Sequence, residues 1–93
     1  MKINSGDFSI DGTFLQGEIK TSFQSLRKIF GDPLVNEPGD KVQAEWNIRF
    51  EDGTVATVYD WKEWGDYKKV QNRHIGGYNN KAVQKVKMAL SIP

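Results

Sequence analysis

The residues NRHIGGYNN, at positions 72 to 80, combine side chains and backbone that suit anion binding. They include Arg73, the single histidine His74 and the adjacent glycines Gly76 and Gly77. A glycine pair directly before a helix leaves backbone N–H groups unshielded, and with the positive end of the helix dipole these groups bind anions. The spacing predicts a phosphate site, and the structural alternative is a tight turn that lets strand and helix pack closely.

Neighbouring side chains suit the same chemistry. Arg73 can add a bidentate guanidinium contact, and Lys81 falls in the first turn of the expected helix. His74 can donate a hydrogen bond to a phosphate oxygen or a ribose hydroxyl. Replacing Arg73 or His74 by alanine is therefore expected to weaken ligand capture and leave the fold intact.

A second candidate element is YDWKEWGDYKK, residues 59 to 69. Trp64 and Tyr67 are expected in a polar loop together with Lys62, a mixture that suits base stacking and phosphate attraction. The alternative is a loop that folds back and anchors on these two rings. Tyr59 and Trp61 are expected on the core side of a strand, in structural roles.

Catalysis has weaker support. The chain has one histidine and no cysteine, and serine candidates such as Ser22, Ser25 and Ser91 lack a nucleophile-elbow motif. Metal hydrolysis usually needs several histidines or clustered carboxylates, so neither a metal nor a cofactor is expected. General acid–base chemistry by His74 beside Asp60 or Glu45 stays open.

Net charge argues against duplex nucleic acid as the partner. Thirteen basic and twelve acidic residues give +1, whereas duplex binders usually carry a strong basic excess. Residues 62 to 87, however, hold seven lysines and arginines against two acidic residues, a local charge of about +5. An anionic partner is expected to meet that segment, unless its lysines only solvate a helix face.

The first elements expected are two short strands and a helix. Strands at 8–10 and 13–20 are joined by a turn at Asp11-Gly12. A helix then starts at Thr21, capped in capping-box spacing with Gln24. It presents one apolar stripe and ends at Gly31 before a proline; the stripe is Phe23, Leu26, Ile29 and Phe30.

Residues 41 to 50 alternate apolar and polar side chains, which predicts a strand with one buried face. A two- or four-residue loop at Asp52-Gly53 would pair this strand with residues 55 to 61. The expected pairs are Phe50 with Val55, Ile48 with Thr57, Trp46 with Tyr59 and Ala44 with Trp61. Glu45 then lies opposite Asp60, an unfavourable pair that a cation such as Arg49 would relieve. Arg49 and Asp60 complete the set of ligand-binding candidates.

The chain is expected to end with a strand at 70–75 and a helix from 81, capped by Asn79 or Asn80. The order β-β-α-β-β-β-α predicts an α+β fold with an antiparallel sheet of about four to five strands and two helices packed on one face. Ninety-three residues are expected to form a single domain, 1–93. Neither a signal-peptide run nor a membrane span is evident, so a soluble protein is expected.

The segments LRKIFGDP, AEWNIRFEDGTVATVYDWK and NRHIGGYNNKAV resemble a family of small, mostly uncharacterised proteins of tailed bacteriophages. The resemblance covers roughly residues 21 to 90, with YDWK at 59–62 and HIGG at 74–77. Proteins of this kind include counter-defence factors that form compact oligomers and sequester nucleotide second messengers. No catalytic residues can be carried over from this family.

The resemblance implies a phage-type counter-defence binding protein of the host cytoplasm. It would sequester a nucleotide-derived immune signal, such as a cyclic dinucleotide or an ADP-ribose derivative, without cleaving it. A homodimer or higher homo-oligomer is expected, because so small a chain has little room for a deep pocket. The alternatives are a protein-interaction inhibitor of a host enzyme and a small phosphodiesterase-like enzyme using His74. Single-stranded nucleic acid is a weaker candidate partner because of the near-zero charge.

Overall fold

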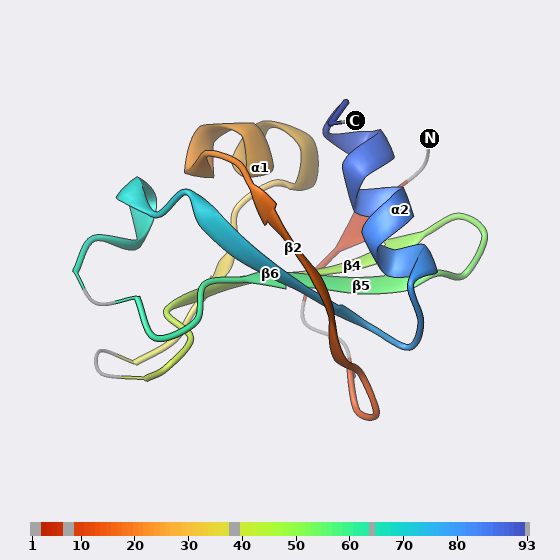
Figure 1. Ribbon diagram of the computed structural model, residues 1–93, viewed down its shortest axis with the longest axis horizontal. Coiled ribbons are helices and arrows are strands. Elements are labelled where there is room, and N and C mark those ends of the chain that lie inside the picture. The colour runs from red at the N-terminus through yellow and green to blue at the C-terminus, as the bar shows by residue number, and fades with distance from the viewer. Residues whose placement is uncertain (1–2, 7–8, 38–39, 64, 93) are drawn as a thin grey trace.

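The computed structural model describes residues 3–6, 9–37, 40–63 and 65–92, which form a six-stranded antiparallel sheet with two helices on one face (Figure 1). This confirms the α+β class and the placement of both helices. The elements are, in chain order, β1 (Ile3–Ser5), β2 (Phe14–Lys20), α1 (Phe23–Phe30), β3 (Leu34–Val35), β4 (Ala44–Phe50), β5 (Val55–Tyr59), the 3-10 turn η1 (Tyr67–Lys69), β6 (Asn72–Gly77) and α2 (Lys81–Ala89). Two of these strands were not expected from the sequence: β1, and the short β3, which pairs with β4. Among the described helices, none is long and apolar enough to cross a membrane.

The strand order is β1-β4-β5-β6-β2, so the two amino-terminal strands lie at opposite edges of the sheet. The expected hairpin of 8–10 with 13–20 is therefore wrong: Phe8 lies outside the described residues, and Ser9 and Ile10 are not in a strand. A turn remains, in which Thr13 N–H donates to Ile10 O at 3.1 Å. β2 pairs instead along its length with β6. This pairing forms a longer ladder than the three-residue strand at 8–10 could have offered.

The β4–β5 hairpin has a different register from the expected one. Phe50 N–H donates to Thr54 O at 2.9 Å, and the loop between these residues contains three residues and ends at Gly53, whose φ is 90°. A three-residue loop with glycine in the left-handed region is a standard hairpin connection. Glu45 consequently pairs with Tyr59. Because side chains alternate along a strand, this one-residue difference moves every β5 side chain to the opposite face.

The core lies between the sheet and the two helices. Trp46 and Ile48 of β4 are buried there, with Leu26 of α1 and Val86 of α2. Ala56 and Val58 supply the β5 side of the core, where Thr57 and Tyr59 were expected. The predicted apolar stripe of α1 is largely buried, although Ile29 is half-exposed.

Helix α1 begins one residue later than expected. Ser22, not Thr21, is its N-cap, and Ser22 Oγ accepts from Ser25 N at 3.1 Å. Thr21 is occupied elsewhere, because its N–H donates to Gln71 O at 2.8 Å and so connects the end of β2 to the start of β6. The carboxyl end is as expected: Gly31 takes φ 86° and its N–H donates to Arg27 O.

Candidate functional site

The glycine pair lies inside a strand, so the predicted phosphate cradle is not formed. Gly76 pairs with Thr57 on one side and Leu15 on the other, and Gly77 pairs with Ala56 and Phe14. Backbone groups inside a ladder are engaged with the neighbouring strands. The pair serves close packing instead. A Cβ on Gly77 would lie 2.4 Å from Ala82 Cβ, and one on Gly76 would lie 2.5 Å from Thr57 Oγ1.

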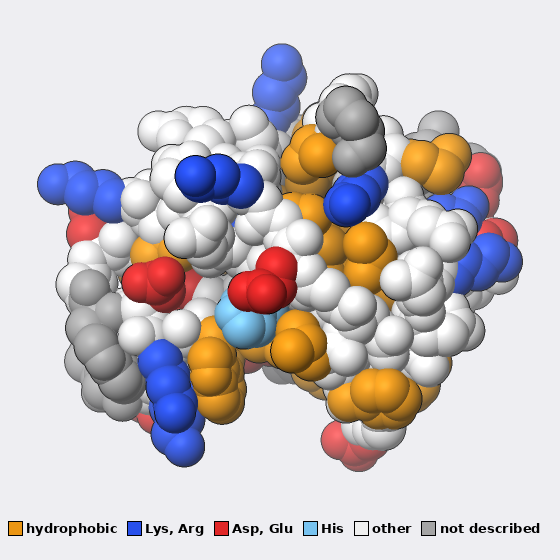
Figure 2. Space-filling view, in the orientation of Figure 1, with side chains coloured by type: hydrophobic (Ala, Val, Ile, Leu, Met, Phe, Trp, Pro, Cys, Tyr) orange, Lys and Arg blue, Asp and Glu red, His pale blue; other side chains and the backbone are white. Residues whose placement is uncertain are grey.

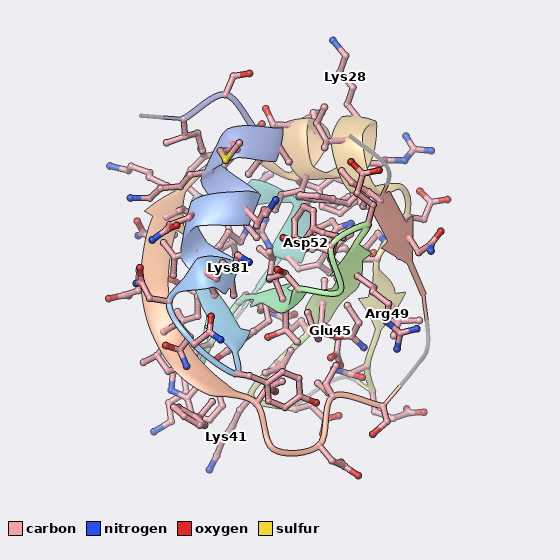
Figure 3. All side chains as sticks on the ribbon, turned by 90° about the vertical axis from the view of Figure 1, so that its right-hand side faces the viewer. Lys28, Lys41, Glu45, Arg49, Asp52 and Lys81 are labelled. Carbon is pink, nitrogen blue, oxygen red and sulfur yellow. The ribbon has the colours of Figure 1, made fainter. Side chains whose placement is uncertain are left out.

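The amino end of α2 is engaged in structural contacts. Lys81 N–H donates to Asn79 Oδ1 at 2.9 Å, and Lys81 Nζ lies 3.5 Å from Asp52 Oδ2. Lys85 Nζ lies 3.1 Å from the same oxygen (Figure 3 shows Lys81 and Asp52). Hydrogen bonds from the Thr54 backbone and side chain, and then Lys85, hold the pKa of Asp52 well below its ordinary value. Lys81 and Lys85 therefore hold α2 against the β4–β5 loop.

Arg73 is fully buried on the helix-covered face, so it does not lie where a surface phosphate could reach it. Its Nη2 donates to the carbonyl oxygens of Tyr67 at 3.1 Å and Val70 at 2.8 Å, and its guanidinium lies 5.6 Å from the Trp46 ring centroid. Burial lowers the pKa of the guanidinium, while the nearby Asp60 carboxylate acts in the opposite direction. Arg73 thus ties the η1 segment to the core, and replacing it is expected to disturb the fold, in contrast to the sequence-based expectation.

The segment at residues 59–69 folds back onto the core, which was the alternative to an exposed stacking surface. The Tyr67 ring lies 5.7 Å from the Phe23 ring and packs against the core, so it is an anchor and not a free stacking platform. Trp64 lies outside the described residues. The positive charge of this segment is dispersed: Lys62 lies over the Trp61 ring at 5.7 Å, and Lys68 lies over the Tyr67 ring at 6.0 Å.

Asp60 is also structural. It is fully buried, and its carboxylate accepts hydrogen bonds from Gln43 N and Ala44 N, both at 2.9 Å. It does not face Glu45, so the predicted like-charge pair does not form. Arg49 lies exposed on the face of β4 that also carries Glu45. Arg49 pairs with Val55 on β5, whereas His74 pairs with Tyr59.

His74 lies on the face of the sheet that the helices leave uncovered, here called the open face: the side of Glu45, Thr57, Tyr59, His74 and Gly76. His74 Nε2 lies 3.4 Å from Glu18 Oε1, and its ring centroid lies 5.6 Å from that of Tyr59. In the space-filling view the histidine has an acidic side chain against it and hydrophobic side chains nearby (Figure 2). Of the predicted site residues, Gly76 lines the cavity described next, and His74 lies against Tyr59, which also lines it.

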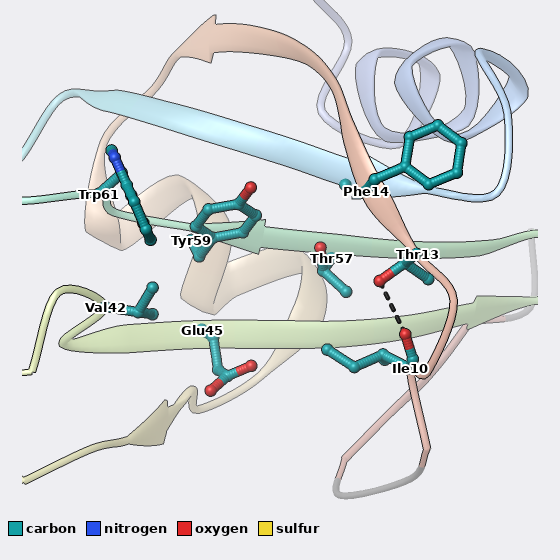
Figure 4. A pocket seen from close by; sticks show the side chains of 9 residues that line it. Ile10, Thr13, Phe14, Val42, Glu45, Thr57, Tyr59 and Trp61 are labelled. Atoms are coloured by element: carbon teal, nitrogen blue, oxygen red, sulfur yellow. Dashed lines mark hydrogen bonds between the residues drawn. The ribbon is translucent and has the colours of Figure 1, made fainter.

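That cavity is a hollow of about 250 Å³ on the open face, here called the open-face hollow (Figure 4). Most of its lining is apolar or aromatic and comes from β2, β5 and the adjacent loops: Ile10, Phe14, Val42, Tyr59 and Trp61. Phe14 and Trp61 are 63% and 41% exposed, so their rings are accessible to a ligand. Burial raises the pKa of the Tyr59 phenol further above its ordinary value, so the hydroxyl is neutral at physiological pH and can donate a hydrogen bond.

The polar part of the lining comes from Thr13, Thr57 and Glu45. Glu45 Oε1 accepts from Asn36 Nδ2 at 3.2 Å, and the same nitrogen donates to Val42 O at 2.9 Å. The Glu45 side chain is thus positioned on the wall of the hollow by a second residue. Thr13 Oγ1 donates to Ile10 O at 2.8 Å and holds the turn that borders the hollow (Figure 4).

A second depression and two lysine side chains lie next to the hollow. Glu45 and Ile10 also border a second, more polar depression of about 510 Å³ whose rim includes Ser9 and Asn36. Lys41 Nζ lies 5.9 Å and Lys62 Nζ 5.7 Å from the Trp61 ring centroid, so two ammonium groups flank the aromatic wall. Among the described residues, no group of three or more histidine, cysteine or acidic side chains could hold a metal ion.

Sequence reasoning missed Tyr59, Trp61 and Glu45 as neighbours because it assumed an even number of hairpin loop residues. The signal that could have found them is the loop Glu51-Asp52-Gly53, which fits a three-residue connection with glycine last. That loop predicts the observed register and places Tyr59 beside Glu45 on the open face.

Comparison with known proteins returned no match among protein-family models, curated proteins or solved structures.

Proposed function

We propose that the protein binds a nucleotide through its base, in the open-face hollow, and does not cleave it. The observation that carries the proposal is that the partly buried Tyr59 ring, the exposed Trp61 ring and the Glu45 side chain line one hollow. Aromatic rings stack on any base, worth about 1–3 kcal/mol each. The positioned carboxylate can accept hydrogen bonds from the edge of that base.

The size of the hollow supports partial insertion of the ligand. About 250 Å³ is below the roughly 300–1,000 Å³ of pockets that enclose whole drug-sized molecules. A base fits such a space, while the sugar and phosphate remain outside. Lys41 and Lys62, at the aromatic wall, supply the charge to attract a phosphate.

The wider role we propose is sequestration of a nucleotide-derived immune signal in the host cytoplasm, with a cyclic dinucleotide or an ADP-ribose derivative as ligand. Support for this role comes from the resemblance to small phage proteins. It requires tight capture and release of the ligand unchanged, so it can be tested separately from base binding by analysing what the protein carries out of an infected-cell extract.

We also propose that the protein acts as a homo-oligomer. Phe14 and Leu15 on edge strand β2 are 63% and 53% exposed, and Phe14 lines the open-face hollow. A second copy packed against this edge would cover both side chains and deepen the hollow. Sedimentation equilibrium tests the idea: a monomer at all concentrations up to those used for ligand binding would exclude it.

The direct test is isothermal titration of the wild-type protein and Trp61→Ala with mononucleotides, cyclic dinucleotides and ADP-ribose. Trp61→Ala is expected to lower affinity about 10- to 100-fold, because one stacking partner is lost. Lys81→Ala is the control, since Lys81 lies at the Asp52 contact and away from the hollow; its affinity should stay within about twofold of wild type. If wild-type protein gives no binding heat with any of these nucleotides, the proposal fails.

A hydrolytic function is the second candidate, and the contact of His74 with Glu18 favours examining it. An imidazole oriented by a carboxylate is the arrangement that general acid–base catalysis uses, and it lies beside Tyr59 of the hollow. Chromatography of the nucleotide after incubation separates the two functions. Recovery of intact ligand supports binding alone. Cleavage that His74→Ala abolishes would make the protein an enzyme.

A further inference from the structure

We infer that the open-face hollow selects guanine over the other bases, and that Glu45 is the residue that makes the selection. The inference rests on the proposed function, because it assigns the base that the same hollow takes. Among the described residues that line the hollow, Glu45 is the only one with an acidic side chain. A carboxylate on an otherwise apolar wall favours a ligand edge that presents hydrogen-bond donors.

Guanine is the base whose Watson–Crick edge presents two neighbouring donors, the ring N1–H and the exocyclic amine. The two oxygens of a carboxylate can accept both at once. Adenine instead presents the N1 lone pair beside its amine, so a carboxylate there meets a repelling acceptor. Cytosine likewise places an acceptor beside its amine, and uracil has one ring donor between two carbonyls.

The position of Glu45 makes such recognition specific. Asn36 holds it through the 3.2 Å hydrogen bond from Nδ2 to Glu45 Oε1. Asn36 is itself held twice to the strand entry, by Nδ2 to Val42 O at 2.9 Å and by its own N–H to Gln43 O at 2.8 Å. A carboxylate has about four acceptor positions, so one hydrogen bond from Asn36 leaves capacity for two donors of a base. Little rotational freedom of Glu45 has to be lost when a base binds.

The rings of the hollow supply the second half of the interaction. Tyr59 pairs with Glu45 directly across the β4–β5 ladder, so their side chains leave the sheet as neighbours on the open face. Tyr59 and Trp61 line the same hollow as Glu45, so a base whose edge meets Glu45 can bring its ring against Tyr59 or Trp61. Stacking adds affinity for every base, whereas the carboxylate distinguishes among them.

The test is equilibrium dialysis at one salt concentration with GMP, IMP and AMP. We expect GMP to bind about 10- to 100-fold more tightly than AMP, which is the range of a bidentate base contact. IMP keeps the N1–H and lacks the amine, so its affinity should fall between the two. Glu45→Gln should remove most of the preference, because its amide offers one acceptor and one donor group. Asn36→Ala, which keeps the carboxylate but releases it, should reduce the preference less.

Glu18→Gln is the matched control: it neutralises another open-face carboxylate, at His74 and outside the hollow, and should leave the preference unchanged. Equal affinity for all three nucleotides would overturn guanine selection while base binding stands. A preference that survives in Glu45→Gln, with the variant shown to be folded by circular dichroism, would overturn the role of Glu45. If none of the nucleotides binds, base binding and guanine selection fall together.

Discussion

Replacing Gly77 by alanine tests the closest contact between the sheet and helix α2. In the native structure a Cβ at this position would lie 2.4 Å from Ala82 Cβ and 3.1 Å from Val55 O. Carbon atoms in contact are normally about 3.5–4.0 Å apart, so the first turn of α2 must move by about 1 Å. The contact involves a short side chain on a helix and cannot be relieved by a rotamer change.

The expected loss of stability follows from two opposing terms. Overpacking of this kind destabilises by about 1–3 kcal/mol. Replacing a glycine also stabilises the protein by about 0.4–1 kcal/mol, because the unfolded chain loses conformational entropy. This gain applies here because Gly77 lies in a strand and has no positive φ. The net change is a loss of about 1–2 kcal/mol. With a urea dependence of about 1–3 kcal/mol per molar, the unfolding midpoint should fall by about 0.5–2 M.

Two further variants make the measurement specific. Gly17→Ala is the matched control, because its Cβ would lie 3.0 Å from Val83 Cγ2, the end of a side chain that can shift; its loss should be smaller. Ala82→Gly destabilises by itself by about 1 kcal/mol through helix propensity. Combined with Gly77→Ala it should destabilise less than the sum of the two changes. A Gly77→Ala protein that unfolds at the wild-type midpoint, with no coupling to position 82, would refute the close packing.

Two other perturbations test the contacts that hold the loops. Arg73→Met keeps the packing on Trp46 but removes the donor to two carbonyl oxygens. It should lower the free energy of unfolding in urea by about 1–3 kcal/mol and speed hydrogen exchange at 66–71. Unchanged exchange would contradict the anchoring role of Arg73. Because Asp52 has a pKa below its ordinary 3.8, its carboxylate stabilises the fold above that pH, and this contribution is lost as pH falls through the lower folded-state value. Asp52→Asn should therefore be less stable at pH 7 and show a smaller fall below about pH 4; equal acid dependence of the two proteins would count against the contact.

Much of the fold could be predicted from local pattern. The apolar stripe of α1, the alternation in β4 and the position of α2 follow from periodicities of 3.6 and 2 residues, which are properties of contiguous sequence. The glycine stop of α1 is equally local, since Gly31 takes a positive φ. The class of the fold, α+β with both helices on one face, required no more than these elements and their order.

The candidate site was predicted less well, because site residues depend on which strands become neighbours. Gly76 was singled out as a phosphate contact and lines the open-face hollow instead, while His74 lies against Tyr59 of the same hollow. Arg73 and Tyr67 were chosen as exposed ligand contacts, yet both pack on the helix-covered side. Their burial comes from Phe23 and Trp46, residues more than twenty positions away in the chain, and no local pattern reports such a contact.

The sequence by itself determined both helices and the three longer strands β2, β4 and β6, although not the short strands β1 and β3. It also placed a histidine, two glycines and several aromatic residues in its last third. Only the tertiary structure decided which face each of them occupies. A three-residue loop at Glu51–Gly53 shifts β5 by one position relative to the expected register. Because side chains alternate between the two faces of a sheet, this shift moves each β5 side chain to the opposite face. Tyr59 consequently lies beside Glu45 in an open hollow and not in the core. Gly76 and Gly77, which look like a phosphate-binding turn in sequence, complete a central strand because β2 and β5 pair with them from both sides.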